Sequence, residues 1–259
     1  MKSYYHEITP HPRLAKFIEC FWYSHVSDDL AQQSGSKRIL PDGCADIIFK
    51  FQNEPACDPL NATNLQDVHF VGEMTRAILV ENTSREVFLG IRFHPGYVHP
   101  FVRAPLHEFT DKTIELDTIE KPLSDQLKER VQEETSIQSR HQLIEHTLFD
   151  FIADSFEPEP CIEYAIQAIL RSKGQVSIQA LCQKMGYSSR YLQKKFKEVV
   201  GIGPKMLCRV VRFRNAYRCL KSSDCKQYAK TALDFGYFDQ AHFNHDFKEF
   251  VGIPPSVQF

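Results

Sequence analysis

The 259 residues of the chain, 42% of them hydrophobic, are enough for two ordinary domains that each bury a core, which excludes general disorder. No apolar run reaches the roughly 20 residues that cross a membrane, and the first residues lack the basic and then apolar pattern of a secretory signal, so we expect a cytoplasmic protein. The net charge of −2 divides into an acidic part, residues 1–160 with 15 Lys and Arg against 26 Asp and Glu, and a basic part, residues 161–259 with 16 against 7, which favours a nucleic-acid partner for the second part.

Short β-rich runs alternate with turn signals over residues 14–117. Breaks such as Pro41-Asp42-Gly43 and Pro95-Gly96 separate the runs, and strands at this spacing are typical of a sandwich or a small barrel. A short helix over 96–103 and a loop with one more extended piece over 105–118 should follow. The predicted strands are residues 17–25, 44–51, 67–71, 77–80 and 86–93.

Two helices are predicted next, over residues 122–134 and 139–155, from apolar residues at helical spacing. The second has a broad apolar face, which we expect to pack within the chain; the alternative is a dimer seam. Glu157-Pro158-Glu159-Pro160 then ends the helix and forms a stiff spacer. This spacer divides the chain into a β-rich regulatory domain over 1–157 and an all-α domain over 161–259.

The all-α domain contains the same unit twice. Gly186-Tyr187 precedes Phe196-Lys197 in the first copy, and Gly236-Tyr237 precedes Phe247-Lys248 in the second. Each copy reads as a helix, a glycine turn and a second helix, which is a helix-turn-helix unit. The two units should cover about 177–201 and 226–252, within helices predicted at 161–172, 177–185, 188–200, 204–221, 226–235 and 239–250.

The second helix of such a unit enters the major groove of DNA, so its outward residues should contact bases and phosphates. We expect six residues of these helices to face the core, His242 only in part: Tyr191, Leu192, Phe196, His242, Phe243 and Phe247. Cys182 and Ala232 supply the small residue at each helix crossing. The predicted DNA contacts are Ser189, Arg190, Gln193, Lys194 and Lys197 in the first copy and Gln240, Asn244 and His245 in the second.

A helix of about 18 residues joins the two units and would span about 27 Å, close to the ~34 Å between successive major grooves on one face of DNA. One chain could therefore engage two adjacent grooves. The first reading helix has four basic residues against Glu198, whereas the last has Lys248 against Asp239, Asp246 and Glu249. We predict that the first copy dominates affinity for DNA.

Three segments of the all-α domain resemble the AraC/XylS-type bacterial transcription regulators: GYSSRYL at 186–192, RFRNA at 212–216 and GYFDQAHF at 236–243. The resemblance implies a sequence-specific regulator that inserts both reading helices into successive major grooves of promoter DNA, with RNA polymerase as a partner and a homodimer as an option. The resemblance assigns base contacts to residues already among the predicted DNA contacts of the two reading helices. Asn244 and His245 stand where the family often has arginine.

The N-terminal part is similar to a sensor domain of some of these regulators, through residues 40–49, 70–72 and 90–96. That similarity implies a cupin-like β fold, so the fold class expected for the chain is α+β with two domains. It implies a small-molecule effector or a partner as the signal. Polar residues among apolar strand residues can line a pocket, and the residues proposed for the effector are Arg38, Asp46, Arg92 and His94, with Arg92 foremost.

Other functions remain as alternatives. The N-terminal domain can be a protein-interaction or dimerisation module without a ligand, or Cys44 can accept an alkyl group and inform the DNA-binding domain. The eight cysteines contain no CxxC pair and fit reduced packing residues, and no cysteines and histidines pair at ligand spacing, so we expect no metal and no cofactor. The chain has no phosphate loop, nucleophile elbow or paired catalytic carboxylates at recognisable spacing, so we expect no enzyme.

Overall fold

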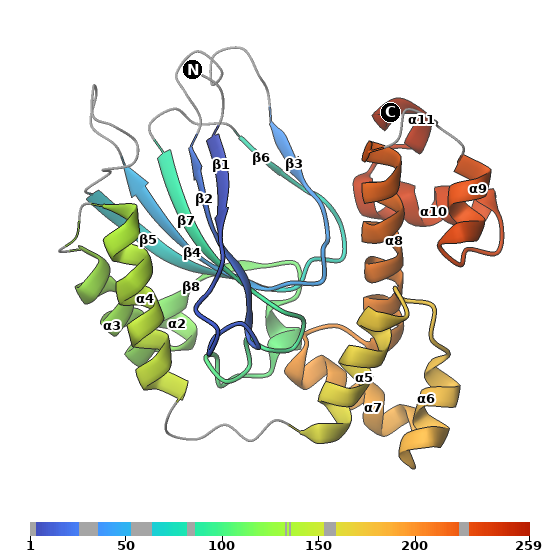
Figure 1. The fold of residues 1–259 in the computed structure, drawn as a ribbon, viewed down its shortest axis with the longest axis horizontal. Coiled ribbons are helices and arrows are strands. Elements are labelled where there is room, and N and C mark those ends of the chain that lie inside the picture. Colours follow the sequence, from blue (N-terminus) through green and yellow to red (C-terminus); the bar gives the residue numbers. More distant parts are fainter. Residues whose placement is uncertain are drawn as a thin grey trace.

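The computed structural model describes residues 4–25, 36–52, 64–81, 86–132, 134, 136–152, 159–222 and 228–259. It has an antiparallel β domain followed by helices and then an all-α region, so the expected fold class is confirmed (Figure 1). None of its described helices is both long and apolar enough to span a membrane.

A six-stranded antiparallel sheet forms the centre of the N-terminal domain, in the order β1-β2-β7-β4-β5-β8. A separate two-stranded ribbon pairs β3 (Lys37–Ile39) with β6 (Ile78–Val80). The sequence missed β1 and β3, which are short and lack strong alternation. The strands of the large sheet are β1 (Tyr4–Ile8), β2 (Ile18–His25), β4 (Asp46–Gln52), β5 (Asn64–Val71), β7 (Glu86–Phe93) and β8 (Thr113–Glu115).

One face of the sheet is covered by α2 (Leu116–Ile119), α3 (Lys121–Gln132) and α4 (Ile137–Ile152) (Figure 1). Ile144 and Leu148 of α4 are fully buried in the same core as the inward-facing strand residues Phe21 and Phe49. The apolar face of α4 therefore packs within the chain, as the sequence predicted. The rest of its predicted range, 153–155, lies outside the described residues, as do Glu157 and Pro158 of the predicted spacer.

The segment 96–103 is a series of turns, and the prediction of a helix there was wrong. Tyr97 N–H donates to His94 and Phe101 N–H donates to Val98, so each turn closes on itself. Pro100 has no N–H to extend a helical ladder, which explains the interruption. A short 3-10 helix, η2 (Leu106–Phe109), comes next.

The all-α region has the predicted helices with small changes at their ends. Ser177, Ser188 and Asp239 accept a backbone N–H and begin three of them, while Gly186 and Gly252 end two of them in the left-handed conformation. The helices are α5 (Pro160–Arg171), α6 (Ile178–Met185), α7 (Ser189–Val199), α8 (Pro204–Ser222), α9 (Tyr228–Asp234), α10 (Gln240–Val251) and α11 (Pro255–Gln258).

Tyr191 and His242 do not face the core, contrary to prediction. Tyr191 is 37% exposed and stacks on Tyr187, and His242 is exposed beside Tyr237. The other four predicted core residues, Leu192, Phe196, Phe243 and Phe247, are fully buried. In α7, Leu192 and Phe196 lie one turn apart and hold the helix against its neighbours, so Tyr191 lies at the edge of the core.

The two parts of the chain pack closely against each other. α8 runs beside the sheet domain, where the Cα of Gly43 lies against Leu207 and Val210 (Figure 1). The hydroxyl of Thr110 donates to the carbonyl of Gly201 at 2.8 Å. The sheet domain therefore contacts the all-α part at the first half of α8 and at the turn before it.

Candidate DNA-binding face and effector site

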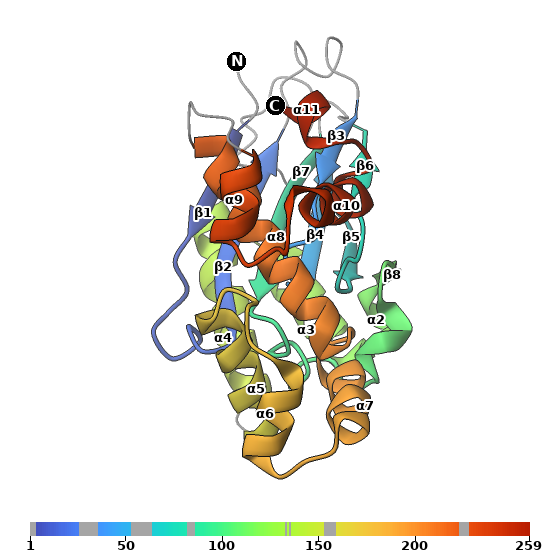
Figure 2. The same cartoon turned by 90° about the vertical axis from the view of Figure 1, so that its right-hand side faces the viewer.

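Each reading helix lies on the same side of the first helix of its unit. In Figure 2, α10 lies to the right of α9 and α7 to the right of α6, with α7 below the lower end of α8. The 19 residues of α8 span about 28 Å at roughly 1.5 Å per residue. Both reading helices can therefore approach one face of a duplex.

The first reading helix presents its predicted residues to solvent. Arg190, Gln193, Lys194 and Lys197 are exposed, and Lys194 pairs loosely with Glu198 at 3.7 Å. Gln193 lies over Gly203, where a Cβ would meet the amide within 2.3 Å.

The remaining predicted residue of α7, Ser189, is also exposed. Its hydroxyl lies 3.7 Å from the Cys182 sulfur. Ser189 therefore helps to hold α7 on α6 through the small residue predicted at this crossing. The matching position in the second copy, Ala232, is fully buried.

The second reading helix is less acidic toward solvent than its sequence suggests. Asp246 is 2% exposed and accepts from Arg209 of α8 at 2.7 Å, and Glu249 pairs with the same guanidinium. Asp239 is occupied as the helix cap, accepting from the His242 N–H at 2.7 Å. The contrast in charge between the two helices is therefore smaller than a count of residues implies.

The helix caps align the two copies residue by residue. Ser188 caps α7 and Asp239 caps α10, so Gln240 corresponds to Ser189 and His245 to Lys194. Gln240 and His245 are exposed, and Asn244 is half-buried. The three predicted reading residues of α10 thus share one side of the helix.

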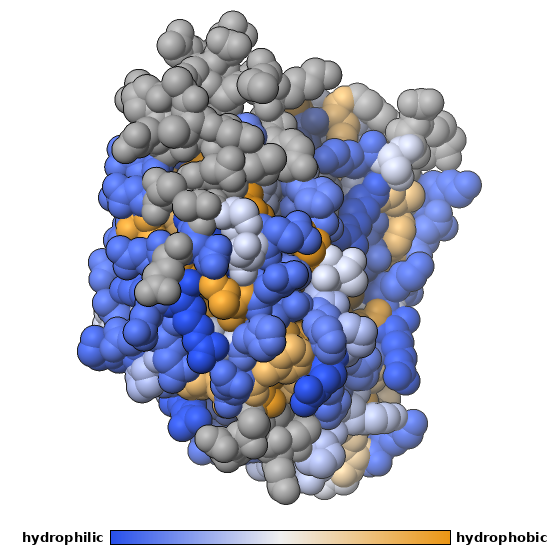
Figure 3. All heavy atoms as spheres, turned by 60° about the vertical axis from the view of Figure 1, so that its left-hand side comes forward, coloured by the Kyte–Doolittle hydropathy of each residue, from blue (hydrophilic) through white to orange (hydrophobic). Residues whose placement is uncertain are grey.

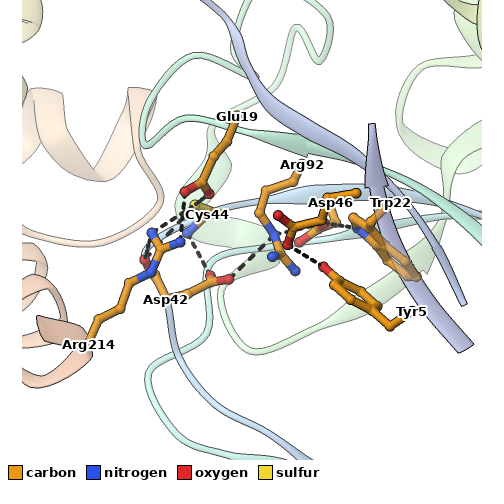
Figure 4. A network of polar contacts seen from close by, with 9 residues as sticks. Tyr5, Glu19, Trp22, Asp42, Cys44, Asp46, Arg92 and Arg214 are labelled. Carbon is orange, nitrogen blue, oxygen red and sulfur yellow. Dashed lines mark hydrogen bonds and ion pairs between the residues drawn. The ribbon is translucent and has the colours of Figure 1, made fainter. Parts of the chain in front are cut away.

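In the sheet domain, Arg92 lies between two carboxylates. Its Nε is 3.5 Å from Asp42 Oδ2 and 3.4 Å from Asp46 Oδ1, and Trp22 Nε1 donates to the same oxygen of Asp46 at 2.8 Å (Figure 4). We call Trp22, Asp42, Asp46 and Arg92 the Arg92 cluster.

The surroundings of the Arg92 cluster favour the charged form of the Arg92 guanidinium and disfavour ionisation of the Asp46 carboxyl group. Burial raises the pKa of Asp46 to about 6 although Arg92 opposes the rise. Burial also opposes the charge of Arg92, but Asp46 and Asp42 together raise the pKa of Arg92 above its usual range. The charge states of Asp46 and Arg92 therefore depend on which anionic groups lie beside the Arg92 guanidinium.

A second set of contacts joins this cluster to the DNA-binding part. Arg214 of α8 donates to Glu19 Oε1 at 2.8 Å and to the carbonyl of Asp42 at 3.3 Å (Figure 4). The Cys44 thiol donates to the other oxygen of Glu19 at 3.3 Å. We call Glu19, Asp42, Cys44 and Arg214 the Arg214 network; it shares Asp42 with the Arg92 cluster.

Two of the four predicted effector residues lie elsewhere. Arg38 donates to Gln258 of α11 at 3.4 Å, which places it at the contact with the second helix-turn-helix unit. The His94 ring is edge-on to Tyr97, and burial lowers the pKa of His94. Only Asp46 and Arg92 come together.

Comparison with known families matches the two halves of the chain separately. Residues 181–258 match the family described as "Helix-turn-helix domain", and residues 6–115 match the family described as "Domain of unknown function (DUF6597)". The first match covers both reading helices and α8. Residues 181–258 therefore form a helix-turn-helix domain.

Some solved structures are similar to the chain at low sequence identity. ToxT from Vibrio cholerae O395 has 10% identity and a TM-score of 0.41 over 87% of this chain and 93% of that one. A second structure of ToxT from Vibrio cholerae has 12% identity and a TM-score of 0.43, with 87% and 94% covered, and unsaturated fatty acid bound wild-type ToxT from strain SCE256 has 13% and 0.38, with 86% and 89% covered. No curated protein matches the chain.

Sequence reasoning missed Glu19, Trp22 and Arg214 as members of a site. Glu19 and Trp22 are single polar or aromatic residues on β2, and Arg214 stands in the RFRNA segment that carried the family resemblance. Only the fold brings residues 19, 42 and 214 together. A polar residue within an otherwise apolar strand was the one available signal for Glu19.

Proposed function

We propose that this protein is a transcription regulator that acts in the cytoplasm, binds promoter DNA through α7 and α10, and is controlled by an effector at its N-terminal domain. RNA polymerase is the proposed partner in transcription. The DNA contacts are proposed to come from the exposed residues of the two reading helices, each of which lies on the same side of the first helix of its unit.

The observation that carries effector control is the sharing of Asp42 by two sets of contacts. Its carboxylate faces Arg92, and its carbonyl accepts from Arg214 of the DNA-binding domain. An effector whose anionic group replaces the Asp42 carboxylate at Arg92 would shift the turn that carries this carbonyl. A change at Arg92 would then reach α8 through one residue.

Arg92→Ala tests the control of DNA binding. We expect the substitution to weaken binding of promoter DNA by roughly 5- to 30-fold, because a coupling between sites is worth about 1–2 kcal/mol and Arg92 lies outside the DNA-binding domain. Fluorescence anisotropy with labelled promoter DNA measures it in the full chain.

Lys50→Ala is the matched control for this test. Lys50 lies on β4 of the same sheet and pairs with Glu86 at 2.7 Å, away from Arg214. Equal affinities for Arg92→Ala, Lys50→Ala and the unchanged protein would refute control through the Arg92 cluster.

A protein-interaction module without a ligand is the second candidate function. In this candidate function, a dimer would form through the surface at α3 and α4. Figure 3 shows hydrophobic residues on this side of the molecule as small patches separated by hydrophilic ones. A dimer seam needs a larger continuous apolar area. Sedimentation of the full chain would detect a homodimer and revive this candidate.

The alkyl-acceptor alternative requires a nucleophilic Cys44. Burial raises the pKa of the Cys44 thiol well above its usual range, and the side chain is 2% exposed. A buried thiol with a raised pKa is a poor nucleophile, so the structure favours a packing and hydrogen-bonding role for Cys44.

A further inference from the structure

A groove lies where the first reading helix ends, between the two domains. One wall is formed by Gln193 and Lys197 of α7 and by Lys205 and Arg209 of α8, and the other by residues of the N-terminal domain, among them Thr75 and His107. Its volume is about 520 Å³, and it is open to solvent. We call it the α7–α8 groove.

The charges that line the α7–α8 groove have one sign. Its lining residues include Lys197, Lys205, Arg209 and His107 and no carboxylate. Arg209 is held by Asp246 and Glu249, whereas no ion pair of Lys197 or Lys205 is found within the described part of the chain. In a protein of net negative charge, two exposed lysines in a groove without acidic residues are suited to an anion.

The N-terminal wall of the groove is fixed in place. Asp111 accepts from both the backbone N–H and the hydroxyl of Thr75, at 2.7 and 2.6 Å, and its own N–H donates to Glu73. The next contacts reach both helix-turn-helix units: Thr110 bonds to Gly201 after α7, and Ala77 N–H donates to the carbonyl of Phe250 in α10 at 2.9 Å. The wall therefore holds one position relative to both reading helices.

The groove is continuous with the proposed DNA-binding face. Gln193 and Lys197 belong both to the exposed face of α7 and to the groove lining. When α7 lies in a major groove, the sugar-phosphate backbone at its edge runs beside these two residues. The backbone would then pass between Lys205 on one wall and His107 on the other.

We infer that the α7–α8 groove binds the phosphate backbone of the target DNA, so that the N-terminal domain itself contributes to the DNA interface through His107. The inference rests on the proposed function. It makes the arrangement of the two domains part of the DNA-binding surface, beyond the contacts of the reading helices.

The test measures the affinity of the full chain for labelled promoter DNA between 50 and 200 mM salt. Lys205→Gln should remove one phosphate contact, which lowers the slope of log affinity against log salt by about 0.9 and makes the fall in affinity over this range about 3-fold smaller. His107→Glu should weaken binding by about 3-fold or more, because it places a carboxylate against phosphate.

His146→Glu is the control, since it makes the same chemical change at an exposed residue of α4 on the far side of the sheet. The inference is overturned if His107→Glu binds as well as His146→Glu, or better, as it would if the N-terminal wall merely blocked DNA. A slope unchanged by Lys205→Gln also overturns it. Binding that depends on Arg190 but on neither groove residue would leave the proposed function standing, and no specific binding by the unchanged protein would defeat both.

Discussion

Asp42 and Asp46, four residues apart, have different roles beside Arg92. Asp42 closes its own turn by accepting the Cys44 N–H at 3.0 Å and also faces Arg92 and, through its carbonyl, Arg214. Asp46 is 8% exposed and accepts from Trp22. A buried carboxylate that shares one cation with a second carboxylate is the group whose protonation the fold favours.

Asp46→Asn should therefore change how stability depends on pH. Burial raises the pKa of Asp46 from 3.8 to about 6, so the folded state binds this proton more tightly than the unfolded state. The free energy of unfolding due to this group is highest below pH 4 and falls as the pH rises through 6. Asparagine keeps an acceptor for Trp22 and cannot ionise, so the variant should gain about 1–3 kcal/mol on the unchanged protein between pH 4 and pH 7.

Urea unfolding of both proteins at the two pH values measures this gain. The exposed residue Asp125 provides a control as Asp125→Asn, since the ion pair that its carboxylate makes within the described residues is with Lys121 in the preceding turn of α3. A difference between Asp46→Asn and the unchanged protein that stays constant with pH would contradict the argument.

At the scale of elements, the duplicated helix-turn-helix unit differs between its copies in how charge is placed. α7 carries Arg190, Lys194 and Lys197 on its exposed face, and α10 carries His245 there while Asp246 turns inward to Arg209. Burial of Asp246 and the pairing of Glu249 with Arg209 reduce the negative charge that α10 presents to DNA. They do not give α10 the cationic side chains that α7 has.

We therefore expect the first reading helix to contribute more to DNA affinity. Arg190→Ala and Lys194→Ala should each weaken specific binding by about 1–3 kcal/mol, the value of one good base contact, and Asn244→Ala and His245→Ala by less. Anisotropy titrations at one salt concentration compare the four variants. A larger loss for the α10 pair would show that the second copy is the principal reader.

At the scale of the whole molecule, contacts between the two domains occur at both ends of α8 and near its middle. Gly201 lies at one end beside Thr110, Arg214 near the middle beside Glu19, and Gln258 of α11 accepts from Arg38 near the other end. Contacts this far apart hold the domains in a single arrangement. The Arg214 network is the one set of these contacts that includes a partly buried ion pair and a residue of the Arg92 cluster.

Arg214→Ala should loosen this arrangement. The Arg214 side chain is 20% exposed and makes a charged hydrogen bond to Glu19, a kind of interaction worth about 1.5–3 kcal/mol. Burial opposes ionisation of Glu19, yet Arg214 lowers the pKa of Glu19, so the pair is charged. We expect faster amide hydrogen exchange at residues 42–46 and weaker binding of DNA.

Arg218→Ala is the control, because Arg218 is exposed on the next turn of α8. Exchange at residues 42–46 that is the same in both variants would show that the Arg214 network does not hold the domains together.

The sequence by itself determined the helical half of this protein. The repeated Gly-Tyr and Phe-Lys pairs, the serine and aspartate caps and the terminal glycines act within a few residues, so the ends of α6, α7, α8 and α10 could be predicted to within one or two residues. The exposed residues of the reading helices followed from the same local periodicity. The strands with strong turn signals, such as β7, were predicted for the same reason.

Only the tertiary structure decided which residues meet. Glu19, Asp42 and Arg214 are separated by up to 195 positions and become neighbours because α8 packs beside the sheet domain. Arg38 and Arg92 are both strand arginines in the sequence, yet one contacts α11 and the other two carboxylates, since their strands belong to different sheets. Local patterns fix elements because they depend on near neighbours along the chain, whereas a site built between domains depends on distances that no local pattern encodes.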